Sequence, residues 1–314
     1  MTRWEEEVAG YLRARRQLGA ILAWDEYLLR QYTTHLAAAG ILTITTANAV
    51  AWAEVPPEGM SKPATRAARR LMAVRGFATY MHALNPAHEI PPQGVFVSSV
   101  HRSAPHIYTN VEISALIDAA GLLARGIREH TYPKLFGLLA ATGLRVGEAL
   151  GLDRDDVDLG TGILAVSSGK SRHPRLVPLH ESATAALGRY ASWRDGHEQR
   201  THAGNAPFFI NRDGDRLPYP NVLQAFYQAT TAAGIYTHRQ HPRMHDLRHT
   251  FAVNTLLGWY RDEVNVAAMM PALSTYLGHS DPANTYWYLS AVPELLAYAA
   301  SRLATLDTRE QVGS

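Results

Sequence analysis

The sequence predicts a mainly α-helical fold with a small β-sheet (α+β), divided into two domains. Apolar residues recur at helical spacing through the first 95 residues and again through the last third of the chain. Between these regions, Gly162–Val166 and Arg175–Leu179 read as two short strands joined by a polar turn. Residues 85–103 are rich in proline and glycine without a sustained period, which indicates a linker. We therefore expect a helical N-terminal domain over residues 1–100 and a second domain over residues 106–314.

Four helices are expected in the N-terminal domain. Pro63 falls in the first turn of the last one, where proline is tolerated. The same helix carries Arg66, Arg69 and Arg70, which lie three and four residues apart and so should share a face. That face is either a contact for a phosphate backbone or an ordinary solvated surface. The four expected helices are Glu6–Leu18, Ile21–Ala38, Thr46–Ala53 and Ser61–Leu84.

The second domain opens with a signal for the start of a helix. Thr109 and Glu112 have the spacing of a capping box, in which each side chain bonds the backbone N–H of the other, ahead of the apolar segment Ile113–Leu123. Further helices are expected over Tyr132–Ala141 and Val146–Leu150, before the two strands. Helical patterns resume after the strands and dominate to the end of the chain.

Composition limits the chemistry that the chain can perform. The 314 residues have a formal net charge of +2 and include no cysteine, which excludes disulfides, thiolate metal sites and a cysteine nucleophile. There is no apolar signal core at the start, and no apolar run approaches the roughly 18 residues of a membrane span, so we expect a cytoplasmic protein without a membrane partner. Lys62, Lys134 and Lys170 are the only lysines among the 30 lysine and arginine residues. Genomic base composition would explain this bias, which still draws attention to each lysine that is retained.

Two segments carry cations suited to binding phosphate. In Ala141-Thr-Gly-Leu-Arg145, a glycine breaks one helix and Arg145 begins the next, where backbone N–H groups and a guanidinium would both attract an anion. Glu148, one turn further on, could hold this arginine, although an ordinary helix junction with a surface salt bridge would look the same. Lys170 stands in the polar turn Ser168–His173 and could protonate a leaving oxygen, whereas a lone loop lysine is usually just solvated.

A third segment is rich in histidine. His245 and Arg248 are three residues apart and would share one face of a helix. His241, His245 and His249 are spaced by four, which could imitate a zinc site. However, Pro242 would disrupt a helix through His241, and no general base of the HExxH kind is present.

The fourth segment, Leu277–Tyr288, has a glycine and a histidine, then a turn, then two tyrosines, and alone it is typical of helix–turn–helix packing. Together and in this order, the four segments resemble the catalytic domain of the tyrosine recombinase (phage integrase) family, over about Thr109–Leu296. The first 95 residues resemble the core-binding domain of that family more loosely. The matching positions are Arg145 in "TGLR", Gly169-Lys170 before Arg175-Leu-Val-Pro, His245-Asp-Leu-Arg248-His249-Thr-Phe-Ala for "HxLRHTFA", Leu277-Gly-His279-Ser for "LGHS", and Tyr288 nine residues after that histidine.

The resemblance implies a site-specific DNA recombinase, of the integrase or transposase type, that cleaves and rejoins strands through a 3′-phosphotyrosyl intermediate. Two arginines and a histidine would bind the phosphate, a lysine would act as general acid, and a second histidine would assist proton transfer to or from the tyrosine. The implied catalytic residues are Arg145 and Arg248 (phosphate), His279 (hydrogen bond), Lys170 (general acid), His245 (proton transfer) and Tyr288 (nucleophile), with Glu148 supporting the first arginine.

The resemblance also implies the partners. Double-stranded DNA would be the substrate, acted on by a homo-oligomer (a tetramer on paired DNA sites) or by an assembly with related recombinases. Neither a cofactor nor a metal is expected, because the energy of the phosphodiester is kept in the protein–DNA bond. A type IB topoisomerase and a non-catalytic DNA-binding protein with the same fold remain as alternatives.

Two features depart from the family pattern or need a choice. Trp259–Pro271 looks like an insertion, which we expect to be a surface loop or a partner contact. Tyr286 and Tyr288 are two residues apart, so on a helix they face different directions and only one can attack. Their distances from His279 favour Tyr288.

Overall fold

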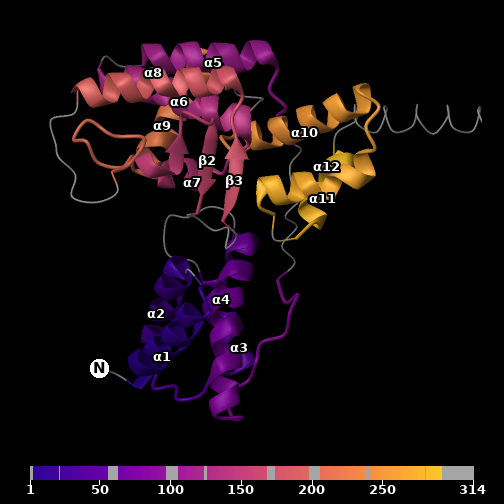
Figure 1. The fold of residues 1–314 in the computed structure, drawn as a ribbon. Coiled ribbons are helices and arrows are strands. Elements are labelled where there is room, and N and C mark those ends of the chain that lie inside the picture. Colours follow the sequence, from indigo (N-terminus) through magenta and orange to yellow (C-terminus); the bar gives the residue numbers. More distant parts are fainter. Residues whose placement is uncertain are drawn as a thin grey trace, which may run out of the picture. The chain divides into compact units, whose positions relative to one another are not determined.

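The structure, a computed structural model, divides the chain into two compact units, Met1–Ser103 (unit 1) and Ala104–Ser314 (unit 2) (Figure 1). No helix in the described part of the chain has both the length and the apolar character to cross a membrane. The residues that the structure describes are 3–20, 22–55, 63–96, 105–123, 126–167, 174–197, 206–237, 241–279 and 281–291.

Unit 1 is a helical bundle in which the longest helix, α4 (Pro63–Leu84), packs against the other three. Their apolar faces meet in a shared core, where Leu29, Tyr32 and Phe77 have no exposed surface. All four predicted helices are therefore confirmed, with slightly shifted ends. The other three are α1 (Arg3–Gln17), α2 (Ala23–Ala38) and α3 (Thr46–Glu54).

The three arginines of α4 do not form the single exposed face that their spacing suggests. Arg70 is buried, with its guanidinium 3.7 Å from the centre of the Trp52 ring and a 2.8 Å hydrogen bond to the Trp52 carbonyl. Arg69 pairs with Asp25 of α2 at 3.1 Å. A shared cationic face is therefore wrong for Arg70, because its flat guanidinium and apolar stem fill the interior beside an aromatic ring.

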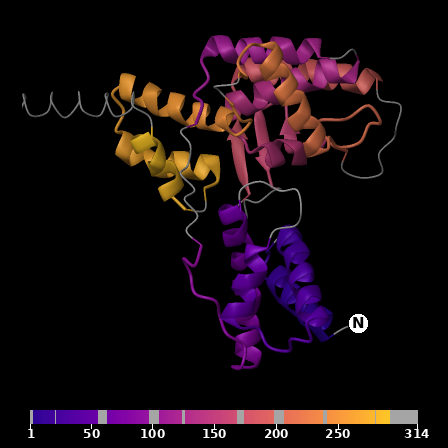
Figure 2. The same ribbon diagram turned by 180° about the vertical axis from the view of Figure 1, so that it is seen from behind.

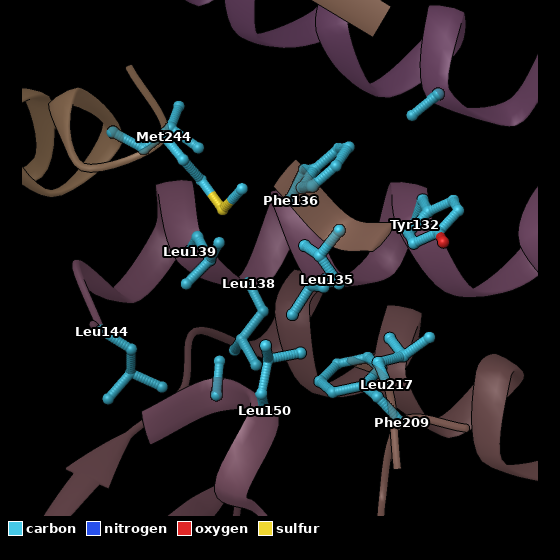
Figure 3. Packing of buried hydrophobic residues seen from close by; sticks show 14 of the residues in the cluster. Tyr132, Leu135, Phe136, Leu138, Leu139, Leu144, Leu150, Phe209, Leu217 and Met244 are labelled. Carbon is cyan, nitrogen blue, oxygen red and sulfur yellow. The ribbon is translucent and has the colours of Figure 1, made fainter. Parts of the chain in front are cut away.

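Unit 2 is built around α6 (Ile127–Thr142), which packs against α5 (Asn110–Leu122), α8 (Glu181–His197) and other helices. This helix is apolar on most sides, which suits a helix surrounded by neighbours. Figure 3 shows its side chains among those of other elements, including Leu150, Phe209, Leu217 and Met244.

The start of α5 confirms the capping box read from the sequence. The Thr109 hydroxyl accepts from the Glu112 N–H at 3.2 Å, and the Glu112 carboxylate accepts from the Thr109 N–H at 2.7 Å. On its other side α5 contacts α9 (Tyr219–Ala232).

A three-stranded antiparallel sheet lies between the helices of unit 2 (Figure 1). The two predicted strands are β2 (Ile163–Val166) and β3 (Arg175–Pro178), paired with Val166 opposite Arg175. A short strand that the sequence reading did not include, β1 (Val157–Asp158), pairs with β2. The turn that carries Lys170 lies outside the described residues.

The last three helices form their own group with a separate apolar cluster, and they lie side by side in both views (Figures 1 and 2). They are α10 (Asp246–Arg261), α11 (Val266–Leu277) and α12 (Ala283–Ala291). The expectation of a surface loop over Trp259–Pro271 is wrong, because this segment ends α10 and begins α11. Met270 is fully buried there, and Asn265 caps α11 by accepting from the Ala268 N–H.

Candidate active site

The turn between α6 and α7 (Val146–Gly151) positions the first arginine. Gly143 ends α6 in the left-handed conformation (φ 62°), and a Cβ at this position would lie only 2.7 Å from Cδ1 of Phe251. Glycine is therefore needed both for the backbone angle and for the space. Arg145 precedes α7 as its N-cap residue, and its backbone N–H donates to Glu148 at 3.0 Å.

Glu148 is a buried carboxylate held between two arginines. Its side chain is 1% exposed and accepts hydrogen bonds from Arg145 at 2.8 Å and from Arg175 at 2.7 and 3.2 Å. Burial raises the pKa of this carboxyl, but the hydrogen bonds from Arg175 and Arg145 outweigh burial and leave the pKa below its ordinary value. Glu148 is therefore an anion that fixes the positions of two guanidinium groups.

Arg248 is buried in the first turn of α10, with 2% of its surface exposed. Its two terminal nitrogens donate to the carbonyls of Gly143 at 2.8 Å and Leu277 at 2.6 Å. Its Nε is also buried and has no hydrogen-bond partner among the residues described. Burial, and then the charge of Arg145, lower the pKa of Arg248 to about 10. Such a cation is stabilised when an anion binds beside it.

The C-terminal end of α11 ties these arginines together. The helix ends at Gly278, which is left-handed (φ 66°), and the carbonyls at such an end carry partial negative charge and lack helical partners. Three successive carbonyls each accept from a different arginine: Tyr276 O from Arg175 (2.6 Å), Leu277 O from Arg248 (2.6 Å) and Gly278 O from Arg145 (2.7 Å). Segments that are far apart in the sequence therefore meet at one turn, and His279 follows this turn directly.

His279 is held as a neutral ring beside the arginines. Its Nδ1 lies 2.7 Å from the hydroxyl of Thr285, which is fully buried. Burial, then Arg248 and Arg145, lower the pKa of His279 to about 3. When the hydroxyl donates to Nδ1, the proton of the neutral ring sits on Nε2, which can then donate to an anion.

The two tyrosines of α12 differ in exposure, as helical spacing predicts. Tyr288 is 1% exposed and Tyr286 is 48% exposed. The Tyr288 hydroxyl lies 2.9 Å from Nδ1 of His249, and its ring centre lies 6.5 Å from that of His279. Tyr288 is thus the tyrosine that faces the cluster of arginines and histidines.

His245 stands at the edge of the cluster. It precedes α10 as the N-cap residue, stays exposed, and contacts the ring of His249 edge to face with centroids 4.8 Å apart. Loss of hydration on its protein-facing side, and then the charge of Arg248, lower the pKa of His245 to about 4. It is therefore neutral at physiological pH while no anion is bound.

The structure brings most of the predicted site residues together. Arg145, Glu148, Arg248 and His279 are joined through the end of α11, Tyr288 lies beside His279, His245 is at the edge, and Lys170 lies outside the described residues. The three histidines spaced by four do not converge, because the His241 ring packs on Tyr236 instead. In the described part of the chain, no group of three or more histidine or acidic side chains could hold a metal ion.

Sequence reasoning missed two residues of the cluster. Arg175 was read only as the start of a strand, yet its side chain binds both Glu148 and the end of α11. His249 was matched to the motif and weighed as a metal ligand but given no catalytic role, yet it contacts the Tyr288 hydroxyl. The signal for His249 was present, since it lies one helical turn after His245. The pairing of Arg175 with Glu148 depends on tertiary contact, and nothing local indicates it.

Comparison with known proteins shows which family has this sequence and fold. The phage integrase family model matches residues 107–294. The putative integrase/recombinase y4rB of Sinorhizobium fredii is 37% identical over 96% of this chain and 98% of its own length. Tyrosine recombinase XerD of Mycobacterium tuberculosis is 30% identical over 83% of each chain. The structure of the Tn1549 transposon integrase is similar in fold, with a TM-score of 0.67 and 17% identity over 95% of this chain and 99% of that one.

The fold and the site define a tyrosine-type site-specific DNA recombinase, an enzyme that cleaves and rejoins DNA strands through a phosphotyrosyl intermediate. The chain belongs to the phage integrase family.

Proposed function

We propose that this recombinase acts on double-stranded DNA with Tyr288 as the nucleophile. Arg145, Arg248 and His279 bind the reacting phosphate. The observation that carries the proposal is the excess of positive charge beside a buried tyrosine: Glu148 binds Arg145 and Arg175, whereas Arg248 is bound, among the described residues, only to backbone carbonyls. Such a cluster is stabilised when a phosphate supplies the missing negative charge.

The proposed chemistry follows from where charge develops. Tyr288 Oη forms a bond to phosphorus, the bond to the 5′ oxygen breaks, and the transition state gathers negative charge on the non-bridging oxygens. Each terminal nitrogen of Arg145 and Arg248 has a second N–H beyond those that bind carbonyls or Glu148, so both side chains can still donate to these oxygens. His279 adds a neutral donor. Losing one such donor typically lowers the rate about 10²–10³-fold.

Lys170 is proposed as the general acid that protonates the 5′ oxygen. Its turn connects β2 to β3, and Arg175 at the start of β3 is bound to Glu148 in the arginine cluster. Lys170 therefore lies in the segment that precedes a strand whose first residue belongs to the arginine cluster, and this supports the proposal.

The same proposal covers the DNA partner of the recombinase and its oligomeric assembly. Residues 1–100 would clamp the DNA, and residues 106–314 would carry out catalysis. The protein would act as a homotetramer on paired DNA sites or together with related recombinases. It would work in a bacterial cytoplasm, associated with the nucleoid when bound to DNA. Two similar folds support DNA as the partner: XerH recombinase is described bound to its palindromic difH substrate (TM-score 0.62, 18% identity), and the Tn1549 integrase bound to transposon right end DNA. The latter also supports a mobile element as the origin of the substrate.

A nicked duplex tests the proposal. Cleavage beside a nick releases a short oligonucleotide and leaves the protein trapped on DNA, as a complex that resists denaturing gel electrophoresis. We expect the unaltered chain to form this complex on DNA taken from the flanks of its gene, Tyr286→Phe to keep at least part of the activity, and Tyr288→Phe to bind DNA without forming the complex. A trapped complex with Tyr288→Phe would overturn the assignment.

A further inference from the structure

The hydroxyl of Tyr288 has a histidine partner other than the one to which the resemblance assigns proton transfer. The motif places histidines at positions 245 and 249, and the resemblance implies that His245 assists proton transfer. In the structure, however, the 2.9 Å contact to Tyr288 Oη is made by Nδ1 of His249, one helical turn further along α10. His245 contacts the ring of His249, with centroids 4.8 Å apart.

We propose that His249 holds the Tyr288 hydroxyl and takes its proton when the phenol attacks DNA, an inference that rests on the recombination reaction proposed above. His249 is a catalytic residue in this account because it touches a reacting atom. His245 is then a neighbour that influences His249 or contacts the phosphate, rather than the first acceptor of the proton.

The surroundings of both rings favour this geometry. Tyr288 is 1% exposed, and its ring packs edge to face against those of His249 and Trp287, with centroids 5.4 and 5.5 Å apart. His249 itself is only partly exposed and also contacts Trp287, at 5.6 Å. The tyrosine is therefore held within a limited set of orientations, and the hydrogen bond to Nδ1 sets the direction of its hydroxyl.

The protonation of His249 depends on every charged group that faces it. These groups are His245, Asp246, Arg243 and Arg248 from α10 and the turn before it, Tyr288 from α12, and His279 after α11. Burial, then the neighbouring His245, lower the pKa of His249 to about 4 in the DNA-free chain, so the ring is neutral at neutral pH, and in the tautomer protonated on Nε2 its Nδ1 accepts from the Tyr288 hydroxyl. A bound phosphate would offset the nearby positive charge and raise this pKa, making the ring a stronger base when the substrate is present.

The proton balance of the proposed step is complete. The Tyr288 Oη–H proton moves to His249 Nδ1 as the Oη–P bond forms, and the 5′ oxygen leaves with a proton from the general acid. In the reverse step a 5′ hydroxyl attacks phosphorus, gives up its proton to that same general acid, and Tyr288 leaves as it regains a proton from His249. No oxidant, metal or further reactant is needed.

A tyrosine analogue with a more acidic hydroxyl can distinguish a proton-accepting role of His249 from a purely structural one. His249→Gln keeps a polar side chain of similar reach but cannot take up a proton near neutral pH, so we expect adduct formation on the nicked duplex to slow by about 10²-fold or more. Replacing Tyr288 with 3,5-difluorotyrosine gives a phenol that ionises more readily and depends less on a base. In the His249→Gln background this replacement should restore the rate to within about tenfold of the unaltered chain.

Two other histidines serve as comparisons. His180→Gln, at an exposed position beside Ser182, should leave the rate unchanged. His245→Gln should not be rescued by difluorotyrosine. The proposal is overturned if His249→Gln cleaves at the normal rate, if its defect is not rescued, or if the rescue appears with His245→Gln instead. If the unaltered chain forms no adduct, or if Tyr288→Phe still forms one, the proposed function itself fails, which is a separate outcome.

Discussion

At the scale of single residues, Glu148 holds the arginine cluster together before DNA binds. Removing a carboxylate from water is costly, and here two guanidinium groups and a backbone N–H offset that cost through direct hydrogen bonds. Without the carboxylate, the positive charges of Arg145 and Arg175 would lie near each other with no negative charge between them. The geometry of the phosphate-binding groups therefore depends on a residue that never has to touch the phosphate.

This dependence can be measured as stability. Glu148→Gln preserves the shape of the side chain but removes the negative charge that pairs with both arginines, so it should lower the free energy of unfolding by about 3–5 kcal/mol in urea titrations. Glu26→Gln is the control, since Glu26 also binds two arginines, Arg16 and Arg30, but at the surface. That change should cost less than about 1 kcal/mol. Equal effects from the two substitutions would contradict the role given to Glu148.

The histidines of the site predict how stability depends on pH. The pKa of His279 is about 3 and that of His249 about 4 in the folded chain, below the ordinary value of 6.5. The unfolded state therefore binds more protons than the folded state between about pH 6.5 and 4, and the free energy of unfolding should fall as pH drops through this window. At about 1.4 kcal/mol for each unit of pKa shift, the expected loss is on the order of 2–3 kcal/mol for each ring.

His279→Asn provides the check on the pH effect. Chemical denaturation at a series of pH values should show a shallower loss of stability for this variant between about pH 6.5 and 4.5. Glu148 is present in both proteins, and its contribution to stability begins to be lost only as the pH falls below about 4.5, so the slopes are compared above that pH. A variant with the same slope as the unaltered chain would show that His279 does not carry the effect.

At the scale of secondary-structure elements, the glycine turn after α6 combines two requirements in one residue. Gly143 is left-handed, its missing side chain admits the Phe251 ring, and its carbonyl accepts from Arg248. A shift of this turn would move the carbonyl, and with it one of the two groups that orient the buried guanidinium.

Gly143→Ala should be more destabilising than the same change at a glycine with open space. Gly234 has a similar backbone angle (φ 71°), but a Cβ there would meet no atom within 4 Å. Both substitutions should cost about 1 kcal/mol for the left-handed conformation, and Gly143→Ala should cost a further 1–3 kcal/mol, roughly, for the clash. Thermal or urea unfolding of the pair measures the difference. Equal costs would mean that Phe251 moves aside freely.

The elements also show which features the sequence could predict. Helix starts such as Thr109 could be predicted because a capping box is a local pattern, and the opposite exposures of Tyr286 and Tyr288 follow from helical geometry alone. Contacts between distant segments could not be predicted in this way. The helical spacing of Arg70 suggested a surface residue, whereas its guanidinium packs on the Trp52 ring. Residues 259–271 were expected to form a loop, but they are largely helical because their apolar side chains join the cluster formed by α10, α11 and α12.

At the scale of the whole molecule, the chain has two units with separate hydrophobic cores. Limited proteolysis of the DNA-free protein should therefore cut first between residues 96 and 108 and leave a C-terminal fragment of about 200 residues. Mass measurement of the fragments identifies the cut. First cuts inside α4 or α5, with the 96–108 segment intact, would count against two separately stable domains.

The central claim is that Tyr288 becomes covalently joined to DNA in a pocket made by Arg145, Arg248 and His279. A phenol is almost entirely protonated at neutral pH, so only a tyrosine delivered to donors and a proton acceptor can attack. The most direct measurement is mass spectrometry of peptides from the trapped protein–DNA complex after protease and nuclease digestion. We expect a nucleotide attached through a 3′ phosphate to the peptide that contains Tyr288, with fragmentation assigning it to that residue. A nucleotide found on Tyr286, Tyr276 or any other residue would contradict the account.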